Sequence, residues 1–143
     1  MRRDEIVEAA RAWLGTSYHH QASLRGVGCD CLGLVRGVWR DLLGDEPEAP
    51  PPYSIRWAES LRQETLAAAA ARHLGPVPFG GQRPGDVLLF RWRERLPAGH
   101  CAILSAPDRI IHAHDGATVA EVAFTPWWRR HLSHAFSFPG VTD

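Results

Sequence analysis

The apolar residues of this chain change their spacing at Gly75, and this change limits the folds that the chain can adopt. Before Gly75 they recur every three or four residues, which is the spacing of amphipathic helices. After Gly75 they fall in short runs of strand length, separated by Pro and Gly residues. Helices followed by strands predict an α+β fold in which N-terminal helices pack on an antiparallel β-sheet.

The predicted elements follow from this spacing and from the residues that end each segment. Helical spacing and terminating glycines predict three helices over residues 4–14, 31–43 and 54–73. Turn-forming or proline-rich composition predicts a loop over 16–30 and an extended surface connector over 46–52. Short apolar runs predict strands over 87–90, 101–104, 109–114, 119–124 and 135–138. A short helical turn opened by Thr125 and Pro126 is predicted before the last strand.

Length and charge narrow the possible functions. The 143 residues predict one domain, 1–143, whose core is large enough to fold without a disulfide or a metal. Sixteen basic residues, all of them arginine, balance sixteen acidic residues, so we expect no nucleic-acid partner. No apolar run approaches the roughly 20 residues of a membrane span. Residues 1–5 have no apolar core behind them, so we expect synthesis in the cytoplasm without a signal peptide.

Cys31 is the strongest candidate for a chemically active residue. It stands at the predicted start of a helix, directly after the potential N-cap Asp30. At that position the positive end of the helix dipole and free backbone N–H groups favour the thiolate. The same N–H groups can hold the oxyanion of a tetrahedral intermediate. The alternative is a buried, inert helix cysteine, but the glycine-containing loop before the helix favours an accessible nucleophile.

A cysteine nucleophile needs a base and a group that orients the base, and histidines on neighbouring predicted strands can supply both. His100 begins one strand and would take the proton of Cys31. His112 lies on the next strand and would bond to the other ring nitrogen of His100. His114 follows two residues later on the same face, so either His112 or His114 can be the orienting group. The alternative for these histidines is a polar strand face near solvent.

A metal site is a rival interpretation of the same part of the sequence. Its potential nitrogen and sulfur ligands are Cys29, Cys31, His100, Cys101, His112 and His114, of which zinc would take four. The spacing of the first two is not the Cys-x-x-Cys of structural zinc sites, and a second such pair is missing. Three cysteines also do not indicate a disulfide framework. Because Cys101 follows His100 on a strand, its side chain points to the opposite face, which favours a core position. We expect no metal and no cofactor.

Taken together, several stretches of the chain resemble the NlpC/P60 family of cysteine peptidases. The resemblance runs from about Asp4 to the end of the chain, and both the motifs and their order carry it. The stretches are 15–18 (Gly-Thr-Ser-Tyr, ahead of the nucleophile), 30–35 (Asp-Cys-Leu-Gly-Leu-Val, around it), 83–90 (Arg-Pro-Gly-Asp-Val-Leu-Leu-Phe, leading into a strand), 99–103 (Gly-His-Cys-Ala-Ile, with the catalytic histidine) and 110–113 (Ile-Ile-His-Ala, with the third catalytic position).

This resemblance implies a papain-like α+β fold with Cys31, His100 and His112 as the catalytic triad. It also implies hydrolysis of peptidoglycan stem peptides, commonly at the amide between γ-D-glutamate and a diamino acid. By the same resemblance, the Tyr18 hydroxyl lies beside the nucleophile and aids the oxyanion. Because stem peptides carry free carboxylates, we expect an arginine at the substrate, and Arg25 in the loop before the nucleophile is the candidate. Asp30 and His114 flank the proposed triad, and we include them with Tyr18 and Arg25 among the expected oxyanion- and substrate-binding residues.

The sequence motif Cys-Asp-Cys-Leu-Gly-Leu resembles the phage-associated branch of the family, and so does the compact chain. This branch includes prophage and gene-transfer-agent cell-wall peptidases. A tail or baseplate protein would then be a partner, and the particle would deliver the enzyme to the periplasm or cell wall of the target cell. The chain departs from the family at Leu32, where Ser is common, and at Cys29. The alternatives are a tail structural or docking component with little activity, and a Cys-His-His amidase or acyltransferase on a non-wall substrate.

Overall fold

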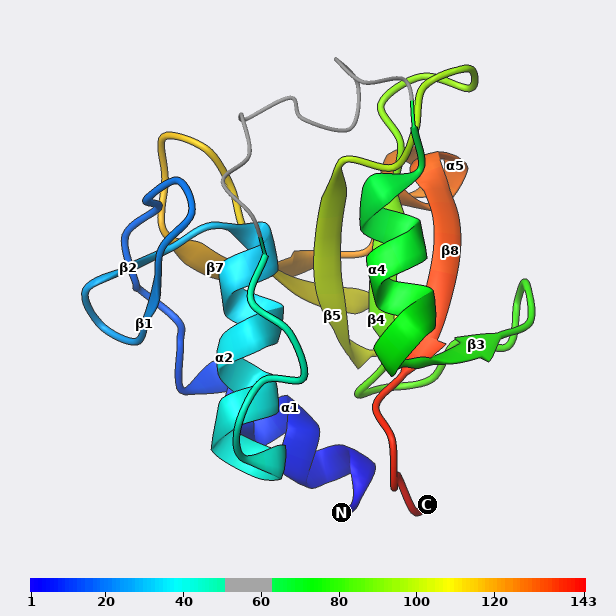
Figure 1. Cartoon of the computed structure of the whole chain (residues 1–143). Helices are drawn as coiled ribbons and strands as arrows, with labels where there is room; N and C mark the ends of the chain where they lie inside the picture. Colours follow the sequence, from blue (N-terminus) through cyan, green and yellow to red (C-terminus); the bar gives the residue numbers. More distant parts are fainter. Residues whose placement is uncertain (51–62) are drawn as a thin grey trace.

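The computed structural model describes residues 1–50 and 63–143, and Figure 1 shows its helices set against an antiparallel sheet. The helices are α1 (Arg3–Arg11), α2 (Cys31–Leu43), α4 (Thr65–His73) and α5 (Pro126–His131). The main sheet has six strands in the order β3-β8-β4-β5-β6-β7. They are β3 (Gly75–Val77), β4 (Val87–Phe90), β5 (His100–Ala106), β6 (Arg109–Ala113), β7 (Val119–Ala123) and β8 (Leu132–Ser137). A separate hairpin, β1 (Ser23–Leu24) and β2 (Gly28–Cys29), precedes α2.

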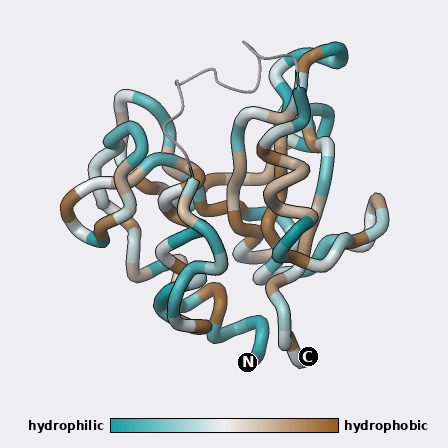
Figure 2. Tube along the Cα trace, in the orientation of Figure 1, coloured by the Kyte–Doolittle hydropathy of each residue, from teal (hydrophilic) through white to brown (hydrophobic). Residues whose placement is uncertain are grey.

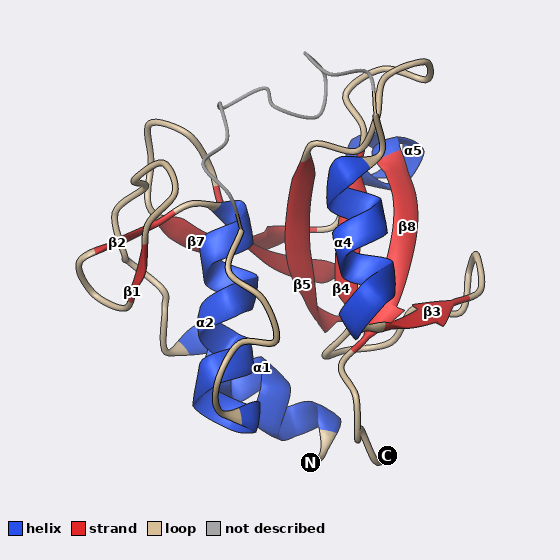
Figure 3. Cartoon of the chain, in the orientation of Figure 1, coloured by secondary structure: helices blue, strands red, loops and turns tan. Residues whose placement is uncertain are grey.

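Both faces of the main sheet are covered, and the strands are therefore apolar on both sides. Val87 and Leu89 of β4 belong to the core beneath α1 and α2, whereas Leu88 and Phe90 belong to a second cluster on the other face. This alternation has the two-residue period of a strand. Figure 3 shows α2 and α4 on one side of the sheet and α5 on the other. Burial on both faces explains why residues 87–90 form a continuous apolar run, and Figure 2 shows apolar residues along the central strands.

The turn that follows α1 packs on α2 at a position that only glycine can occupy. The fully buried ring of Trp13 lies against Gly37, where an added Cβ would come within 2.0 Å of that ring. The indole nitrogen of Trp13 donates a hydrogen bond to Asp41 (3.1 Å) further along α2. These contacts fix α2 on α1, and α2 in turn packs on β5 and β6. The start of α2 is thereby held near the start of β5.

The turn before β4 is held by a buried carboxylate. Asp86 accepts hydrogen bonds from the Arg3 guanidinium (2.8 Å) and from the backbone N–H of Arg83 (2.8 Å). Gly85 has a φ of 94° and lies directly beneath α1, so the turn requires a residue without a Cβ. The Pro-Gly-Asp stretch therefore joins α1 to the sheet and sets where β4 begins.

The predicted order and type of the elements are confirmed for most of the described residues. The helix from Cys31 ends before Gly44, and the strand over 87–90 has the predicted bounds. The other predicted strands differ from β5, β6, β7 and β8 only at their ends. The helical turn after Thr125 is also confirmed, with the Thr125 side chain as its cap. The α+β class, with N-terminal helices on an antiparallel sheet, is therefore correct.

Two short features were not predicted. The segment 16–30, predicted as a loop, contains the hairpin β1–β2, whose two-residue strands are too short to show an alternating pattern. Strand β3 contains Pro76, a strand breaker by sequence, but it lies at the edge of the sheet, where proline is tolerated.

Two other predictions extend beyond the described residues. The helix predicted over 54–73 is observed as α4, and its portion 54–62 lies outside the described residues. The last two residues of the predicted connector 46–52 also lie outside them. Among residues 1–50 and 63–143, no helix has the length and apolar character needed to cross a membrane.

Candidate active site

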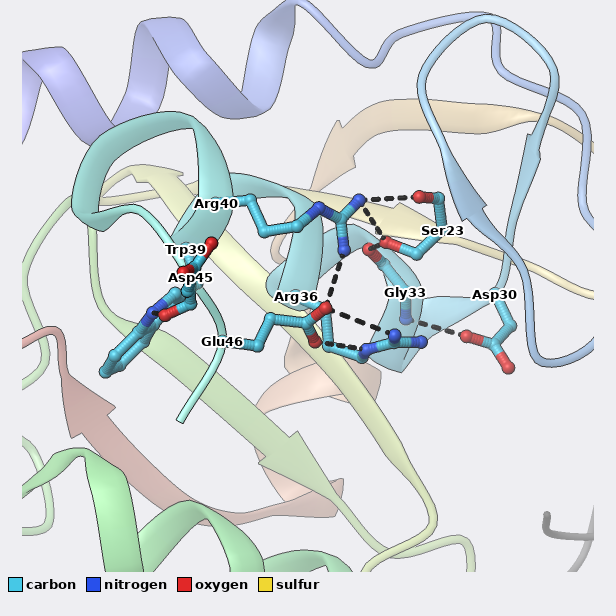
Figure 4. Close-up of polar contacts among 8 residues, drawn as sticks. All are labelled: Ser23, Asp30, Gly33, Arg36, Trp39, Arg40, Asp45 and Glu46. Atoms are coloured by element: carbon cyan, nitrogen blue, oxygen red, sulfur yellow. Dashed lines mark hydrogen bonds and ion pairs between the residues drawn. The ribbon is translucent and has the colours of Figure 1, made fainter. Parts of the chain in front are cut away.

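Cys31 is the first residue of α2, and Asp30 caps the helix as predicted. The buried carboxylate of Asp30 accepts hydrogen bonds from the backbone N–H of Gly33 (2.7 Å) and of Gln21 (2.8 Å). Figure 4 shows the bond to Gly33 at the helix start. The cap satisfies one N–H group of the first turn and places the sulfur of Cys31 at the positive end of the helix dipole.

Hydrogen bonds join the hairpin β1–β2, which precedes Cys31, directly to α2 (Figure 4). Ser23 Oγ donates a hydrogen bond to the carbonyl oxygen of Gly33 (2.6 Å), and Arg40 donates to Ser23 Oγ (2.9 Å). Arg40 also pairs with Glu46 beyond the end of the helix (3.0 Å). A Cβ on Gly33 would lie 1.9 Å from the carbonyl oxygen of Ala22, so glycine is required for this close approach. The loop and the first turn of α2 are therefore one packed unit.

His100 and His112 form a buried pair between β5 and β6. His100 Nε2 and His112 Nδ1 lie 3.0 Å apart, and the two rings are almost perpendicular at 88°. Antiparallel pairing of Ile103 with Ile111 sets the histidines on a diagonal of the ladder. The ring of His114 is exposed, and its centre lies 6.4 Å from that of His100. Of the two candidate orienting groups, His112 is the one within hydrogen-bonding distance of His100.

The environment of His112 keeps its ring neutral. Burial lowers the pKa of His112 to about 3, and the neighbouring His100 and His114 contribute to the shift. A neutral imidazole that carries its proton on Nε2 accepts a hydrogen bond at Nδ1. His112 is therefore suited to accept a bond from His100 Nε2–H, which leaves Nδ1 of His100 for Cys31. We assign this tautomer because it lets His100 keep Nδ1 for Cys31.

The surroundings of Cys31 favour its thiolate. The thiol and the backbone N–H of Cys101 and the ring of His100 lie close enough to Cys31 to affect its pKa. The Cys101 thiol is the largest cause that holds the pKa of Cys31 well below its usual value; burial opposes it, and the charge of His100 reinforces it. The pKa of Cys101 is raised well above normal by this contact and by burial, so Cys101 remains a donor. A thiolate is the reactive form of cysteine, which makes Cys31 a fit nucleophile.

The other two cysteines lie in the core. Cys101 is buried beneath α2, as predicted, but its contact with Cys31 was not predicted. Burial, with the charge of Asp30, raises the pKa of Cys29 to about 12, so Cys29 remains a thiol at neutral pH. All three cysteines are free. Only Cys31 combines partial exposure with a lowered pKa.

Tyr18 lies close enough to Cys31 for their charges to interact. Burial raises the pKa of Tyr18 above its normal value, and the charges of Cys31 and Asp30 add to the shift. Its hydroxyl therefore keeps its proton and can donate a hydrogen bond to a developing negative charge. The backbone of Tyr18 is held by a hydrogen bond to the carbonyl of Ala117 (2.9 Å) and by a bridge to Cys29.

The remaining predicted site residues are Arg25, His114 and Asp30. Arg25 is exposed in the turn between β1 and β2, on the hairpin that packs against α2. His114 is exposed directly after β6, with its ring centre 5.7 Å from that of His112. Asp30 is buried and serves as the helix cap.

Two tryptophans that the sequence did not single out flank His100. Trp128 of α5 is stacked on the His100 ring, with centres 5.7 Å apart and an angle of 26°. Trp92 lies 5.2 Å from His100 on the connection between β4 and β5. In the sequence, Trp127 and Trp128 have the character of ordinary core or rim residues, and no local signal relates them to a histidine 28 positions earlier. Within the described ranges, no three His, Cys, Asp or Glu side chains are grouped to hold a metal ion.

Comparison with known proteins shows similarity in structure. No protein-family model matches the sequence, and no curated protein matches it. The NlpC/p60 domain of the peptidoglycan hydrolase SagA superposes with a TM-score of 0.67 at 20% identity, over 96% of this chain and 100% of that domain. An NlpC/P60 family protein from Bacillus cereus superposes with a TM-score of 0.68 at 18% identity, over 95% of this chain and 40% of that chain.

A third solved structure, Ly7917 with the hydrolyzing product of MDP, has a TM-score of 0.57 at 17% identity, over 96% of this chain and 63% of that chain. The chain therefore spans the whole SagA domain but less than half of the Bacillus cereus protein. These similarities confirm the predicted fold, which is the papain-like α+β fold of NlpC/P60 domains.

Proposed function

We propose that this chain is an NlpC/P60-type cysteine peptidase, with residues 1–143 as one domain, that hydrolyses amide bonds in peptidoglycan stem peptides. The observation that carries this proposal is the position of Cys31 at the start of α2, where the charge of His100 helps to lower its pKa, together with the pairing of His100 with His112. A nucleophile, a base and an orienting group in that order are the parts that covalent amide hydrolysis needs.

The proposed reaction has two steps. The Cys31 thiolate attacks the amide carbonyl carbon, and the C–N bond breaks as His100 gives its Nδ1 proton to the leaving amine. His100 then takes a proton from the water that attacks the thioester, and the carboxylic acid and the free thiolate result. His112 orients the His100 ring and stabilises its charged form. Backbone N–H groups at the start of α2 and the Tyr18 hydroxyl stabilise the oxyanion of both steps.

The proposed bond is the amide between γ-D-glutamate and a diamino acid. Support for the substrate class comes from the structural neighbours, since SagA is named a peptidoglycan hydrolase and Ly7917 is described with a hydrolysis product of MDP. Arg25, exposed on the hairpin beside α2, is proposed to bind a carboxylate of the stem peptide. The ring of His114 lies beside that of His112 at the edge of the same site. Asp30 caps α2 and so helps to hold the backbone N–H groups that are proposed to bind the oxyanion.

We also propose a phage-tail or gene-transfer-agent setting, in which a tail or baseplate protein carries the enzyme to the cell wall of the target cell. The resemblance of the sequence around Cys31 to that branch supports this proposal. Co-elution of the purified chain with candidate tail or baseplate proteins in size-exclusion chromatography tests it. Separate elution from all components of the particle would contradict the association.

The central experiment is mass spectrometry of the fragments released from purified sacculi. We expect the wild-type chain to release stem peptides cut within the peptide, and the masses identify the bond. Cys31→Ala should release none, whereas Cys29→Ala, which changes a buried thiol two residues away, should release the same fragments as the wild type. If the wild type releases nothing although iodoacetamide modifies Cys31 rapidly, the nucleophile is active and the substrate proposal is wrong.

A further inference from the structure

The indole ring of Trp128 contacts both histidines of the proposed site. It is stacked on His100, with ring centres 5.7 Å apart and planes at 26°. The same indole meets the ring of His112 at a steep angle of 77°, with centres 5.1 Å apart. The hydrogen bond between His100 Nε2 and His112 Nδ1 thus has one aromatic side chain against both of its partners.

The position of Trp128 is set by α5 and by the apolar cluster beneath it. Thr125 caps the short helix by accepting from the backbone N–H of Trp128, and Pro126 provides its first turn. The indole packs edge-on against the ring of Phe90, at 4.9 Å between centres. Phe90 is fully buried in β4, whose register pairs it with His100. The helix, the sheet and the histidine therefore form one packed assembly.

We propose that Trp128 is a positioning residue. It holds the His100 ring in the orientation in which one nitrogen faces Cys31 and the other faces His112, and it covers the hydrogen bond between the two histidines. The inference rests on the proposed function, because it assigns a role within the same site. Trp128 touches the faces and edges of the imidazoles, so it acts through His100 rather than on the substrate.

The geometry explains why an aromatic ring suits this role. The nitrogens of His100 bond in the plane of the ring, so a side chain stacked on its face leaves Nδ1 and Nε2 free for Cys31 and His112. A flat neighbour restricts rotation of the imidazole about its χ2 angle, which is otherwise a broad torsion. An indole has no acceptor atom that could compete for the proton of His100. Covering the His100–His112 bond also keeps water from it and strengthens it.

Trp127 provides a matched control on the same helix. Trp127 is 45% exposed, and its ring lies against those of Trp92, Trp128 and His131. Within the part of the chain that the structure describes, no ring contact joins Trp127 to His100 or His112. Replacing Trp127 therefore removes a similar side chain from α5 without touching the histidine pair.

The test compares Trp128→Leu, Trp128→Phe and Trp127→Leu. Leucine fills apolar space without a flat face, whereas phenylalanine retains the flat face. The readout is the pH profile of Cys31 alkylation by iodoacetamide, which reports the thiolate–imidazolium pair and needs no substrate. We expect Trp128→Leu to slow alkylation at neutral pH about tenfold and to shift the profile, while Trp128→Phe and Trp127→Leu remain close to wild type. Equal profiles for the two leucine variants would overturn the proposal.

A second measurement covers the case in which Trp128→Leu does not fold. Nitrogen-15 NMR of the histidine rings reports proton exchange with water at the His100–His112 bond. Because phenylalanine covers less of this bond than tryptophan, we expect faster exchange in Trp128→Phe than in the wild type, and unchanged exchange would overturn the inference. If sacculi are not cleaved but alkylation still responds to Trp128, only the substrate proposal fails.

Discussion

The two faces of the main sheet make different contributions to the site. On one face, α1 and α2 pack on β5 and bring Cys31 against Cys101. On the other face, Phe90 and Trp128 pack against His100. His100 is the first residue of β5, so the proposed nucleophile and the proposed base lie where the strand begins and both faces are within reach. The position of the proposed nucleophile therefore depends on a helix end, whereas that of the proposed base depends on packing between aromatic residues that are distant in the sequence.

Removing the base should produce the largest effect. We expect His100→Ala to lower the rate of muropeptide release about 10²–10⁴-fold, because a general acid and base are lost from both steps. Rates are measured on sacculi, with circular dichroism to show that the variant is folded. A variant that keeps more than about a tenth of the wild-type rate would remove His100 from the acid–base role assigned to this side of the sheet.

The second prediction separates His112 from His114. We expect His112→Ala to lower the rate of muropeptide release about 10- to 100-fold, since the His100 ring loses its hydrogen-bond partner and its orientation. His114→Ala should have a clearly smaller effect, because its ring is exposed and its centre lies 6.4 Å from that of His100. A larger loss for His114→Ala would transfer the orienting role to that residue.

The third prediction is that burial of neutral His112 makes the free energy of unfolding depend on pH in acid. His112 has a lowered pKa of about 3 in the folded chain, mainly because of burial, against about 6.5 when unfolded. The unfolded chain therefore binds more protons between these values, and the stability that is present above pH 6.5 is lost as the pH falls toward 3. We expect a loss of the order of a few kcal/mol in urea unfolding.

The matched variants for this measurement are His112→Asn and His114→Asn. Unfolding is compared at neutral pH and at about pH 4.5, a value between the two pKa values of His112. The acid sensitivity should decrease in His112→Asn and stay near wild type in His114→Asn, whose ring is exposed. The same acid sensitivity in both variants would show that His112 is not buried in its neutral form.

The smallest predicted effect is that of Cys101 on the reactivity of Cys31 at the start of α2. Cys101→Ala removes the thiol that donates to Cys31, so the pKa of Cys31 should rise and less thiolate should be present at neutral pH. We expect alkylation of Cys31 to slow by up to about tenfold, with the profile moved toward higher pH. Cys29→Ala is the control, since it also removes a buried thiol but one that does not donate to Cys31. Identical profiles for the two variants would exclude the donor role of Cys101.

Helix caps and apolar runs, which are local features of the sequence, predicted the bounds of several elements. The cap Asp30, the helix start at Cys31 and the end at Gly44 are read from neighbouring residues, and each is observed. The continuous apolar run 87–90 predicts a strand, and β4 has those bounds. The missed hairpin and β3 are too short, or too rich in turn residues, for any periodic signal to appear.

Sequence alone determined the fold class, the helix that begins at Cys31 and the two strands that carry His100 and His112, because caps and periodicity act over a few residues. The tertiary structure decided the rest. It placed His112, rather than His114, within hydrogen-bonding distance of His100, because these positions depend on the register and the diagonal geometry of β5 and β6. It also brought Cys101 to the nucleophile and Trp128 to the histidines, because such contacts arise only when separate elements pack together.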